Sequence, residues 1–518
     1  MKTKLLCTCL LAFAAGSAFA QETVDTAMMR KIRNEGLNHS KVMETAFYLT
    51  DASGPRISGS PELKHAQDWA VNQLTSWGLV NAKREAWGKF GKGWEIQKNY
   101  AAITVPYYHA IIAIPKAWTP GTGGPVTGDV VVIKADTITD MDKYKGKLQG
   151  KIIIFDVKPN VERTFKPDAM RYTDSVLNEM ANAKAQGARP AFNANSPQFA
   201  ARRRATALRA AITDFLQNEH VALILSQARG TDGTVFTTNG ASYADTAKSI
   251  PPELETSGED YQRILRLVKA GIPVKMEADI KTQFFTDDLN GYDVVAEIPG
   301  TDKKLKDQVV MIGGHLDSWH GATGATDNGA GSAVMMEAIR ILKAVNFKPR
   351  RTIRIALWSS EEQGLFGSKG YVLNHFGDPK TMVLKPEQEK ISAYYNLDNG
   401  TGKIDGIYLQ GDSTAGPIFK AWLAPFNDIS SGTVTIRNTG STDHVSFDAV
   451  GIPGFEFIQD PLDYGARTHH SNQDTYDKLS EDDLKQSATI VAAFVYNTAQ
   501  RNDMIPRKPL PQPQPVTH

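Results

Sequence analysis

The stretch from Gln308 to Leu342 constrains the fold more than any other part of this chain. An apolar run within it ends in two glycines, and His315 and Asp317 follow at alternate positions. A glycine-rich loop then leads to Asp327 and into an apolar segment with helical character. Open α/β sheets bind their ligands at the carboxyl ends of strands, where polar loops of this kind precede helices. We therefore expect a functional site in this loop.

From Leu289 to Arg501 strand patterns alternate with helix patterns. Apolar runs such as VVMIGG, TIRIALWS and ISAYYNLD are separated by segments with helical spacing, and a final helix is expected over residues 480–501. This alternation predicts an α/β sandwich with a largely parallel sheet. We assign residues 287–502 to this domain and residues 21–117 to its N-terminal part.

The character of the sequence changes near Trp118. The Gly- and Pro-rich TPGTGGPVTGD precedes short strand patterns, and a helical stretch that includes FAARRRATALRAAITDFLQNE interrupts them. We interpret residues 118–286 as an inserted, strand-rich domain with a helical excursion. Residues 503–518 are proline-rich and are expected to form an extended, disordered tail.

The N-terminus has the pattern of an export signal. Lys2 and Lys4 precede an apolar run, and the small-x-small triplet AFA follows. This pattern predicts that residues 1–20 are a secretory signal peptide. We therefore expect an exported protein, periplasmic or secreted. No later apolar run is long enough to span a bilayer, so no membrane association is expected after cleavage.

Composition argues against several kinds of partner and mechanism. The formal net charge is +1, so no overall field favours nucleic acid, and we expect no nucleic-acid partner. Cys7 and Cys9 are the only cysteines, and both lie in the export signal. The mature chain is therefore expected to use neither a disulfide nor a thiolate ligand or nucleophile.

Histidines and carboxylates gather where the expected strands end. VVMIGG leads to a His, TIRIALWSS to a Glu-Glu pair and ISAYYNL to an Asp, and a His-His pair follows near the C-terminus. Zinc takes histidine nitrogen and carboxylate oxygen, and two zinc ions need a bridging carboxylate plus about two further ligands each. The residues that meet this need are His315, Asp327, Glu362, Asp398 and His470.

Glu361 and Glu362 need different roles in such a site. Neighbouring side chains at a strand end point in opposite directions, so one carboxylate can bind metal while the other acts as a general base. Asp317 can hold the second imidazole nitrogen of His315 and fix its tautomer, which makes it a further candidate catalytic residue. Together these residues form a cluster that no structural need explains.

Five motifs, GGHLDS, TDNGAG, WSSEEQGLFGS, NLDNG and HHSNQDT, together resemble the di-zinc aminopeptidase family that includes carboxypeptidase Q. The resemblance covers residues 289–501, and residues 25–108 match the family's N-terminal helical part. It implies that residues 287–502 form a di-zinc peptidase domain with a central mixed sheet flanked by helices. The inserted segment resembles the protease-associated domain of this family, except for its helical excursion.

Carried over residue by residue, the resemblance implies that Asp327 bridges two zinc ions. His315 and Asp398 would complete one zinc site, and Glu362 and His470 would complete the other. The peptide bond after the bridging aspartate is often cis in this family, so a cis bond is expected here. His470 is preferred to its neighbour as the ligand because the Ser and the later Asp that follow it match the family's pattern.

The resemblance also implies roles around the metal ligands. Glu361 would be the general base. His469 stands where many simple aminopeptidases have a tyrosine, so it is the candidate that stabilises the oxyanion. The segment STDHVSFDAVGIPG resembles the family's substrate-pocket loop, and Asp443 and His444 in it are candidates for contacting the substrate terminus. A purely structural capping role for Asp443 is an equal alternative.

These roles predict an exported exopeptidase with two zinc ions that cleaves short peptides as an aminopeptidase or dipeptidase. A second hypothesis is a single-zinc aminoacyl cyclase of the same fold, against which His315 argues. A third is a non-catalytic binding protein on a peptidase scaffold, which would have lost ligands or the base. Zinc content per chain separates the three hypotheses. The sequence leaves open which end of the peptide is recognised and whether the chain forms a homodimer.

Overall fold

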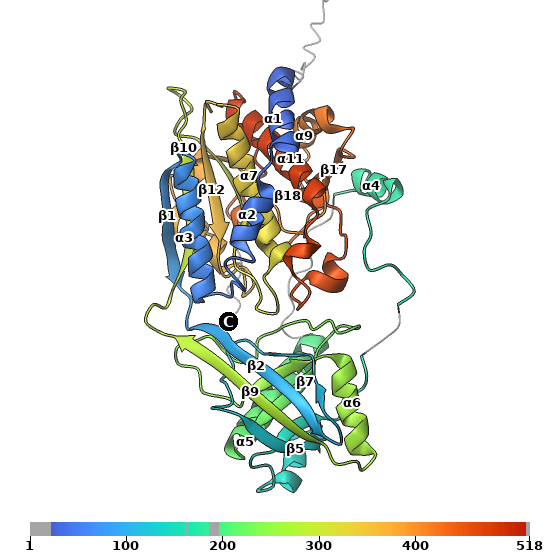
Figure 1. Cartoon of the computed structure of the whole chain (residues 1–518). Helices are drawn as coiled ribbons and strands as arrows, with labels where there is room; N and C mark the ends of the chain where they lie inside the picture. The colour runs from blue at the N-terminus through green and yellow to red at the C-terminus, as the bar shows by residue number, and fades with distance from the viewer. Residues whose placement is uncertain (1–21, 161–163, 186–195, 514–518) are drawn as a thin grey trace, which may run out of the picture.

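The computed structural model describes residues 22–160, 164–185 and 196–513. The expected export signal, with Cys7 and Cys9, lies outside the described residues. Figure 1 shows a larger body and a smaller one, each built on its own eight-stranded sheet. The expected α/β fold with a mixed sheet flanked by helices is confirmed.

The larger sheet has the strand order β1-β10-β12-β11-β15-β18-β16-β17. Its central strands β12, β11, β15 and β18 are parallel neighbours, whereas β10 pairs antiparallel with β1 and β12, and β16 pairs antiparallel with β18. Strands β11, β15 and β18 are buried along their whole length, which explains their continuous apolar runs. The strands are β1 (Val80–Lys89), β10 (Asn290–Ile298), β11 (Val309–His315), β12 (Thr352–Trp358), β15 (Ile391–Asn396), β16 (Ile404–Tyr408), β17 (Thr433–Thr435) and β18 (Gly454–Gln459).

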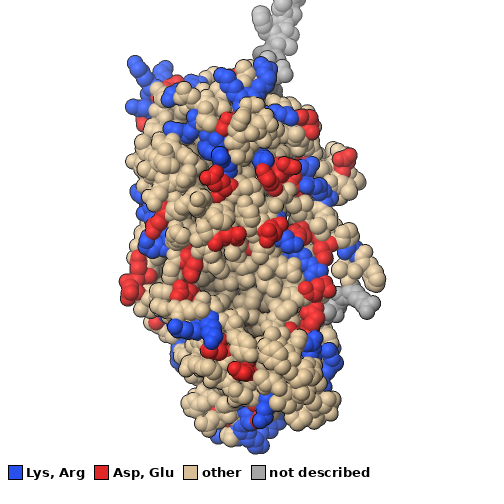
Figure 2. Space-filling view, in the orientation of Figure 1, with Lys and Arg blue, Asp and Glu red and all other residues tan. Residues whose placement is uncertain are grey.

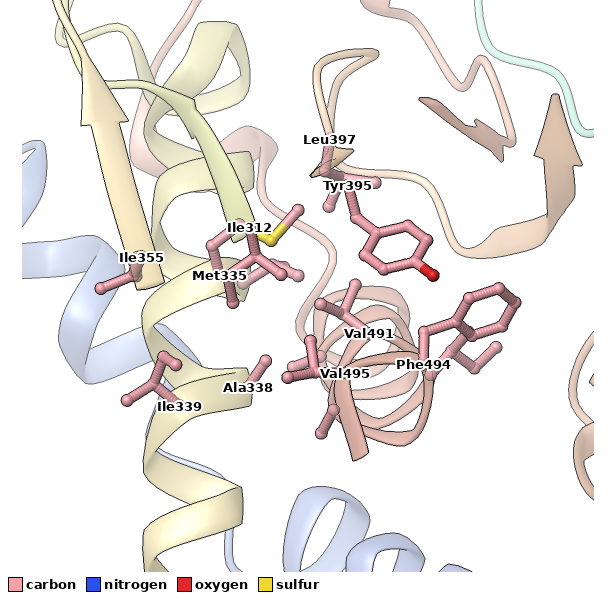
Figure 3. Packing of buried hydrophobic residues seen from close by; sticks show 14 of the residues in the cluster. Ile312, Met335, Ala338, Ile339, Ile355, Tyr395, Leu397, Val491, Phe494 and Val495 are labelled. Atoms are coloured by element: carbon pink, nitrogen blue, oxygen red, sulfur yellow. The ribbon is translucent and has the colours of Figure 1, made fainter. Parts of the chain in front are cut away.

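Helices cover both faces of this sheet. On one face α7 (Ala330–Ala344) and α11 (Glu481–Gln500) pack together, and α1 (Thr26–Asn38) and α2 (Val42–Leu49) lie against them. Figure 3 shows this core, in which side chains of β11, β12 and β15 meet those of α7 and α11. The residues labelled there are Ile312, Met335, Ala338, Ile339, Ile355, Tyr395, Leu397, Val491, Phe494 and Val495.

The opposite face has a smaller aromatic core. Trp358 and Tyr394 of the sheet pack against Phe447, with the rings of Tyr394 and Phe447 stacked 4.0 Å apart. The elements on this side are α8 (Phe366–His375), α10 (His444–Asp448) and the short ribbon β13 (Gly377–Asp378) and β14 (Val383–Leu384). Two further helices, α3 (Pro61–Ser76) and α9 (Gly416–Leu423), pack against β1 and β17.

The smaller sheet has the order β3-β2-β9-β5-β6-β7-β8-β4. Residues 109–115 pair with β2 through β3 and with β8 through β4, so one continuous segment joins the two ends of the sheet. Helix α5 (Pro197–Asn218) and helix α6 (Gly258–Lys269) pack on separate apolar clusters. The strands are β2 (Gly93–Val105), β3 (His109–Ala110), β4 (Ala113–Pro115), β5 (Val126–Ile133), β6 (Ile152–Phe155), β7 (Leu223–Gln227), β8 (Glu253–Thr256) and β9 (Lys275–Phe285).

The second sheet enters and leaves the main domain through neighbouring strands. The chain passes from β1 to β2 and returns from β9 to β10, and β1 pairs with β10 just as β2 pairs with β9. The sheet therefore begins at Gly93, earlier than the start expected at Trp118. The Gly- and Pro-rich segment used for that expectation lies inside the second domain, after β4 and running into the start of β5.

The helical excursion expected in the inserted domain divides between the two bodies. Helix α4 (Asp174–Ala181) lies on the main domain beside β17, as Figure 1 shows at its right edge. Its Leu177 and Met180 pack with Ile458, and the hydroxyl of Thr435 donates to the carbonyl of Met180 at 2.5 Å. Helix α5 returns to the second sheet.

The described part of the C-terminal tail is docked rather than disordered. Ile505 is buried, and Arg507 donates to the carbonyls of Gln388 and Ile391 at 2.8 and 2.6 Å. The sequence suggested disorder because it has no helix or strand pattern, and the structure shows that side chains fasten this segment instead.

The described surface carries both signs of charge. On the face in Figure 2 the acidic and basic side chains are interspersed, as the net charge of +1 suggests. Among the described residues, no helix is long and apolar enough to cross a membrane.

Candidate metal centre

The candidate ligands meet at the carboxyl ends of neighbouring parallel strands. His315 is the last residue of β11, Glu361 and Glu362 follow β12, and Asp398 follows β15. Because β12, β11 and β15 are adjacent and parallel, these side chains reach the same edge of the sheet. Asp327 comes from the loop before α7.

The carboxylate of Asp327 lies between two histidines. His315 Nε2 is 3.3 Å from Asp327 Oδ1 and 3.2 Å from Asp398 Oδ1. On the other side His470 Nε2 is 3.2 Å from Asp327 Oδ2 and 2.8 Å from Glu362 Oε2. We call His315, Asp327 and Asp398 the first ligand group, and Asp327, Glu362 and His470 the second. The two groups share only Asp327.

His469 and His470 compete for a place in the second group. Both lie close enough to Asp327 to hold a metal ion with it. His469 Nε2 is 3.9 Å from Asp327 Oδ2, however, and its side chain is 40% exposed against 27% for His470. The geometry favours His470 as the ligand and leaves the more exposed His469 beside it, with the two rings tilted and their centroids 3.7 Å apart.

The electrostatics of the cluster suit cations. Burial raises the pKa of Glu361 and of Glu362 well above the usual range. Burial acts in the same direction on Asp327, but hydrogen bonding to His315 and the charge of His470 lower its pKa overall. Asp327 Oδ2 and Glu362 Oε1 are buried and accept no hydrogen bond from the described residues. Buried carboxylates need cationic partners, so this donor set fits metal ions.

Asp317 supports the site in a way that differs from the expected one. The backbone carbonyl of Asp317, 2.9 Å from His315 Nδ1, accepts the imidazole proton, while its carboxylate lies 3.5 Å away. That carboxylate instead accepts the backbone N–H groups of Glu361 and Glu362 at 3.2 and 3.4 Å, and the Ser58 hydroxyl at 3.3 Å. Asp317 is fully buried, so it positions the glutamates and does not face a substrate.

Asp443 and His444 do not line the opening of the site either. Both are fully buried, and neither oxygen of Asp443 has a hydrogen-bond partner among the described residues. Burial raises the pKa of Asp443 to about 7 and lowers that of His444 to about 4. They were expected to contact the substrate terminus from a substrate-pocket loop, whereas α10 carries His444 inward against β18.

Arg56 is a functional residue that the sequence did not single out. Its guanidinium is fully buried and donates to the carbonyls of Leu316, Thr323 and Gly324 at 2.6, 2.6 and 2.8 Å. It therefore holds both ends of the glycine-rich loop between His315 and Asp327. The sequence offered only one signal, an arginine inside the otherwise small and polar SGPRISGSPE.

Asp474 holds the backbone next to the shared carboxylate. It accepts the N–H groups of Thr326 and Asp327 at 2.6 and 3.1 Å. The Asp327-Asn328 bond is cis, as expected. The Asn328 side chain then accepts the N–H of Gly331, at the start of α7, at 2.9 Å.

Glu456 plays the corresponding role for Asp398. It accepts the backbone N–H of Asp398 at 2.9 Å and the Asn396 amide at 2.7 Å. Burial raises its pKa to about 8. It lies inside β18, in an apolar run that gave no sign of a site residue.

Comparison with known proteins agrees with this geometry. Residues 293–495 match the model of peptidase family M28. Carboxypeptidase Q from Mus musculus is 27% identical over 96% of this chain and 97% of its own length, and the protein of that name from Homo sapiens is 24% identical over 96% and 97%.

Solved structures share the fold. A peptidase M28 precursor from Shewanella amazonensis SB2B has a TM-score of 0.64 at 25% identity and covers 94% of this chain and 98% of its own. A zinc aminopeptidase from Bacillus subtilis has a TM-score of 0.54 at 19% identity, with coverage of 89% and 95%.

Replacing Asp474 with asparagine should weaken metal binding without unfolding the chain. The amide keeps the size of the carboxylate but loses the charge that holds the N–H groups of Thr326 and Asp327. We expect zinc affinity to fall about tenfold to hundredfold, the usual cost of losing such a support. Competition titration with a zinc chelator measures this loss. The control Asp477→Asn changes an exposed carboxylate of the same loop, and an equal effect in both variants would contradict the role of Asp474.

The choice between the two histidines can be tested by metal content. His470→Ala removes the side chain 2.8 Å from Glu362, so it should lose one zinc equivalent, whereas His469→Ala should retain full content. Metal analysis of the dialysed proteins measures both. Loss of an equivalent in His469→Ala alone would reverse the assignment.

Proposed function

We propose that this metallopeptidase, whose residues 293–495 match the model of peptidase family M28, is an exported, two-zinc exopeptidase that cleaves short peptides. The observation that carries the proposal is the shared carboxylate of Asp327, with one ligand group on each of its oxygens. One carboxylate between two histidine-containing groups is the arrangement that a pair of metal ions requires. Export rests on the signal pattern of residues 1–20.

Zinc ions held by His315, Asp327, Glu362, Asp398 and His470 would supply a water of lowered pKa and polarise the scissile carbonyl. Glu361 is the general base in this proposal. It belongs to neither ligand group, its side chain is 9% exposed, and Asp317 fixes its backbone. Burial raises the pKa of Glu361, which suits a carboxyl that takes a proton from water and passes it to the leaving amine.

The surroundings of the site support short peptides as substrates. The exposed edge of the centre is His469, and the loop that carries it is hydrogen-bonded to residues 231–237 of the inserted domain. The inserted domain therefore lies at the open side, where it limits access by a folded protein. His469 at this edge is placed to donate to a developing oxyanion.

The competing functions account for fewer of these features. A single-zinc cyclase of the same fold has no use for a complete second group, yet Glu362 and His470 are in contact. A non-catalytic binding protein has no need of Glu361 as a base in addition to all the ligands. Both alternatives predict fewer than two zinc ions per chain.

Arg229 favours recognition of a free peptide carboxylate, and therefore dipeptides. Its guanidinium lies 4.8 Å from the ring centroid of Phe236 and makes no ion pair with a described residue. The carbonyl of Arg229 accepts the backbone N–H of Phe236 at 3.4 Å, and Phe236 forms a bridge with Ser471, the residue after His470. An unpaired guanidinium binds a carboxylate with two parallel hydrogen bonds.

Glu361→Gln should retain zinc but lose turnover. The amide cannot accept the proton of water, so we expect kcat for dipeptides to fall by about a hundredfold to ten-thousandfold. Hydrolysis of dipeptides followed by mass spectrometry, with metal analysis of the same sample, checks both parts. Glu389→Gln, at an exposed position, is the control. Full turnover in Glu361→Gln, or activity that survives removal of metal by a chelator, would overturn the mechanism.

Arg229→Met should change the preference between a dipeptide and its C-terminal amide. We expect kcat/KM for the dipeptide to fall about tenfold to hundredfold, the range of a hydrogen-bonded charge pair, while the amide is unaffected. Arg203→Met is the matched control, because Arg203 also stacks on a phenylalanine, Phe199, at 5.4 Å. Equal losses with dipeptide and amide would rule out carboxylate recognition by Arg229.

A further inference from the structure

The loop that carries His470 is held by the inserted domain as well as by its own domain. Thr237 donates both its backbone N–H and its hydroxyl to the carbonyl of His470, at 2.7 and 2.9 Å. Phe236 forms an isolated antiparallel bridge with Ser471. We call the loop that carries His470 the ligand loop. Residues 231–237, in the connection between β7 and β8, thus run alongside this loop. We call residues 231–237 the clamp.

Asn472 extends this pairing by one residue. Its backbone N–H donates to the carbonyl of Val235 at 3.1 Å, and its side-chain oxygen accepts the N–H of Val235 at 2.8 Å. Its amide nitrogen donates to the carbonyl of Gly233 at 3.0 Å. Asn472 therefore uses its backbone N–H and both side-chain polar atoms on the clamp.

Arg467 fastens the start of the ligand loop to two parts of the inserted segment. Its guanidinium pairs with Asp168 at 2.7 Å and with Asp232 at 2.8 Å. It also donates to the carbonyl of Thr231 and the hydroxyl of Thr234, at 2.8 and 2.9 Å. These bonds raise the pKa of Arg467, so the pairing persists across the ordinary pH range.

His470 needs such support because of its backbone conformation. Its φ is +60°, in the left-handed region that residues other than glycine rarely adopt. The two hydrogen bonds from Thr237 end on the carbonyl of this same residue. They hold the peptide in the orientation that brings His470 Nε2 to 2.8 Å from Glu362.

The first ligand group has a different kind of support. His315 is held by the carbonyl of Asp317, and Asp398 by Glu456, both within the main domain. Among the described residues that hold these two ligands, none comes from the inserted domain. Of these ligands, His470 is the one whose own backbone accepts hydrogen bonds from the inserted domain among the described residues.

We propose that the clamp positions His470 and so sets the metal affinity of the second ligand group alone. The inserted domain is then a structural part of one metal site, and Arg467, Asn472 and Thr237 are positioning residues. The proposal rests on the two-zinc function above. Its rival is that these contacts only attach the inserted domain to the main domain.

Arg467→Met and Asn472→Ala, made in the full chain, separate these two explanations. Each should weaken the second zinc equivalent about tenfold to hundredfold and leave the first unchanged. Stepwise zinc titration against a competing chelator measures the two affinities. Addition of Co²⁺ gives an independent readout, since the absorption of the second equivalent should shift. Arg467→Lys keeps the charge pairs with Asp168 and Asp232 and should restore part of the affinity.

Arg437→Met is the matched control. Arg437 pairs with Glu179 of α4 at 2.8 Å, so it also joins the excursion to the main domain, but away from the ligand loop. It should leave both affinities unchanged. Thr237→Val, which removes only the hydroxyl donor, is the milder test and should weaken the second equivalent about twofold to tenfold.

The outcomes distinguish the proposal from the function on which it rests. Wild-type affinities in Arg467→Met, Asn472→Ala and Thr237→Val would overturn the clamp, as would equal weakening of both equivalents. If the wild-type chain binds no zinc and cleaves no peptide, the proposed function fails instead.

Discussion

The carboxylate of Asp327 is the interaction on which the site depends. Each of its oxygens faces a different histidine, and both must be held while the group is buried among other acids. The chain meets this demand through the backbone: Asp474 accepts the N–H of Asp327, and the Asn328 side chain accepts the N–H of Gly331 at the start of α7. The sheet contributes the rest, because adjacent parallel strands end at this point.

The sequence predicted the parts of the site that follow from strand order and motif spacing. Strand β11 and the loop to Asp327 could be read from an apolar run, two glycines and a helix pattern. The structure brings Glu362, Asp398 and His470 to that loop, as the motifs implied. These side chains could be named because a metal site needs particular residue types at strand ends.

What the sequence could not supply was the hydrogen bonding that orients these ligands. His315 Nδ1 can donate either to the carboxylate or to the backbone carbonyl of Asp317. The choice depends on the backbone conformation between the two residues, which the residue types do not decide. Arg56 acts through carbonyls more than 250 residues away, so no local pattern marks it. The resemblance named Asp443 and His444 as substrate contacts, but it could not show that tertiary packing buries both side chains.

The paired strands that join the two domains have a consequence for synthesis and folding. Strand β1 leaves the ribosome long before β10, its partner, and the entire second sheet is made between them. That sheet starts and ends on the paired strands β2 and β9, so once it has folded it brings the ends of β1 and β10 together. Closing a flexible loop costs entropy, and each doubling of its length adds about 0.6 kcal/mol to that cost. Because the folded second sheet already holds its two ends together, the pairing of β1 with β10 does not have to close a long flexible loop. The inserted domain can thus serve as a folding template for the edge of the sheet that it interrupts.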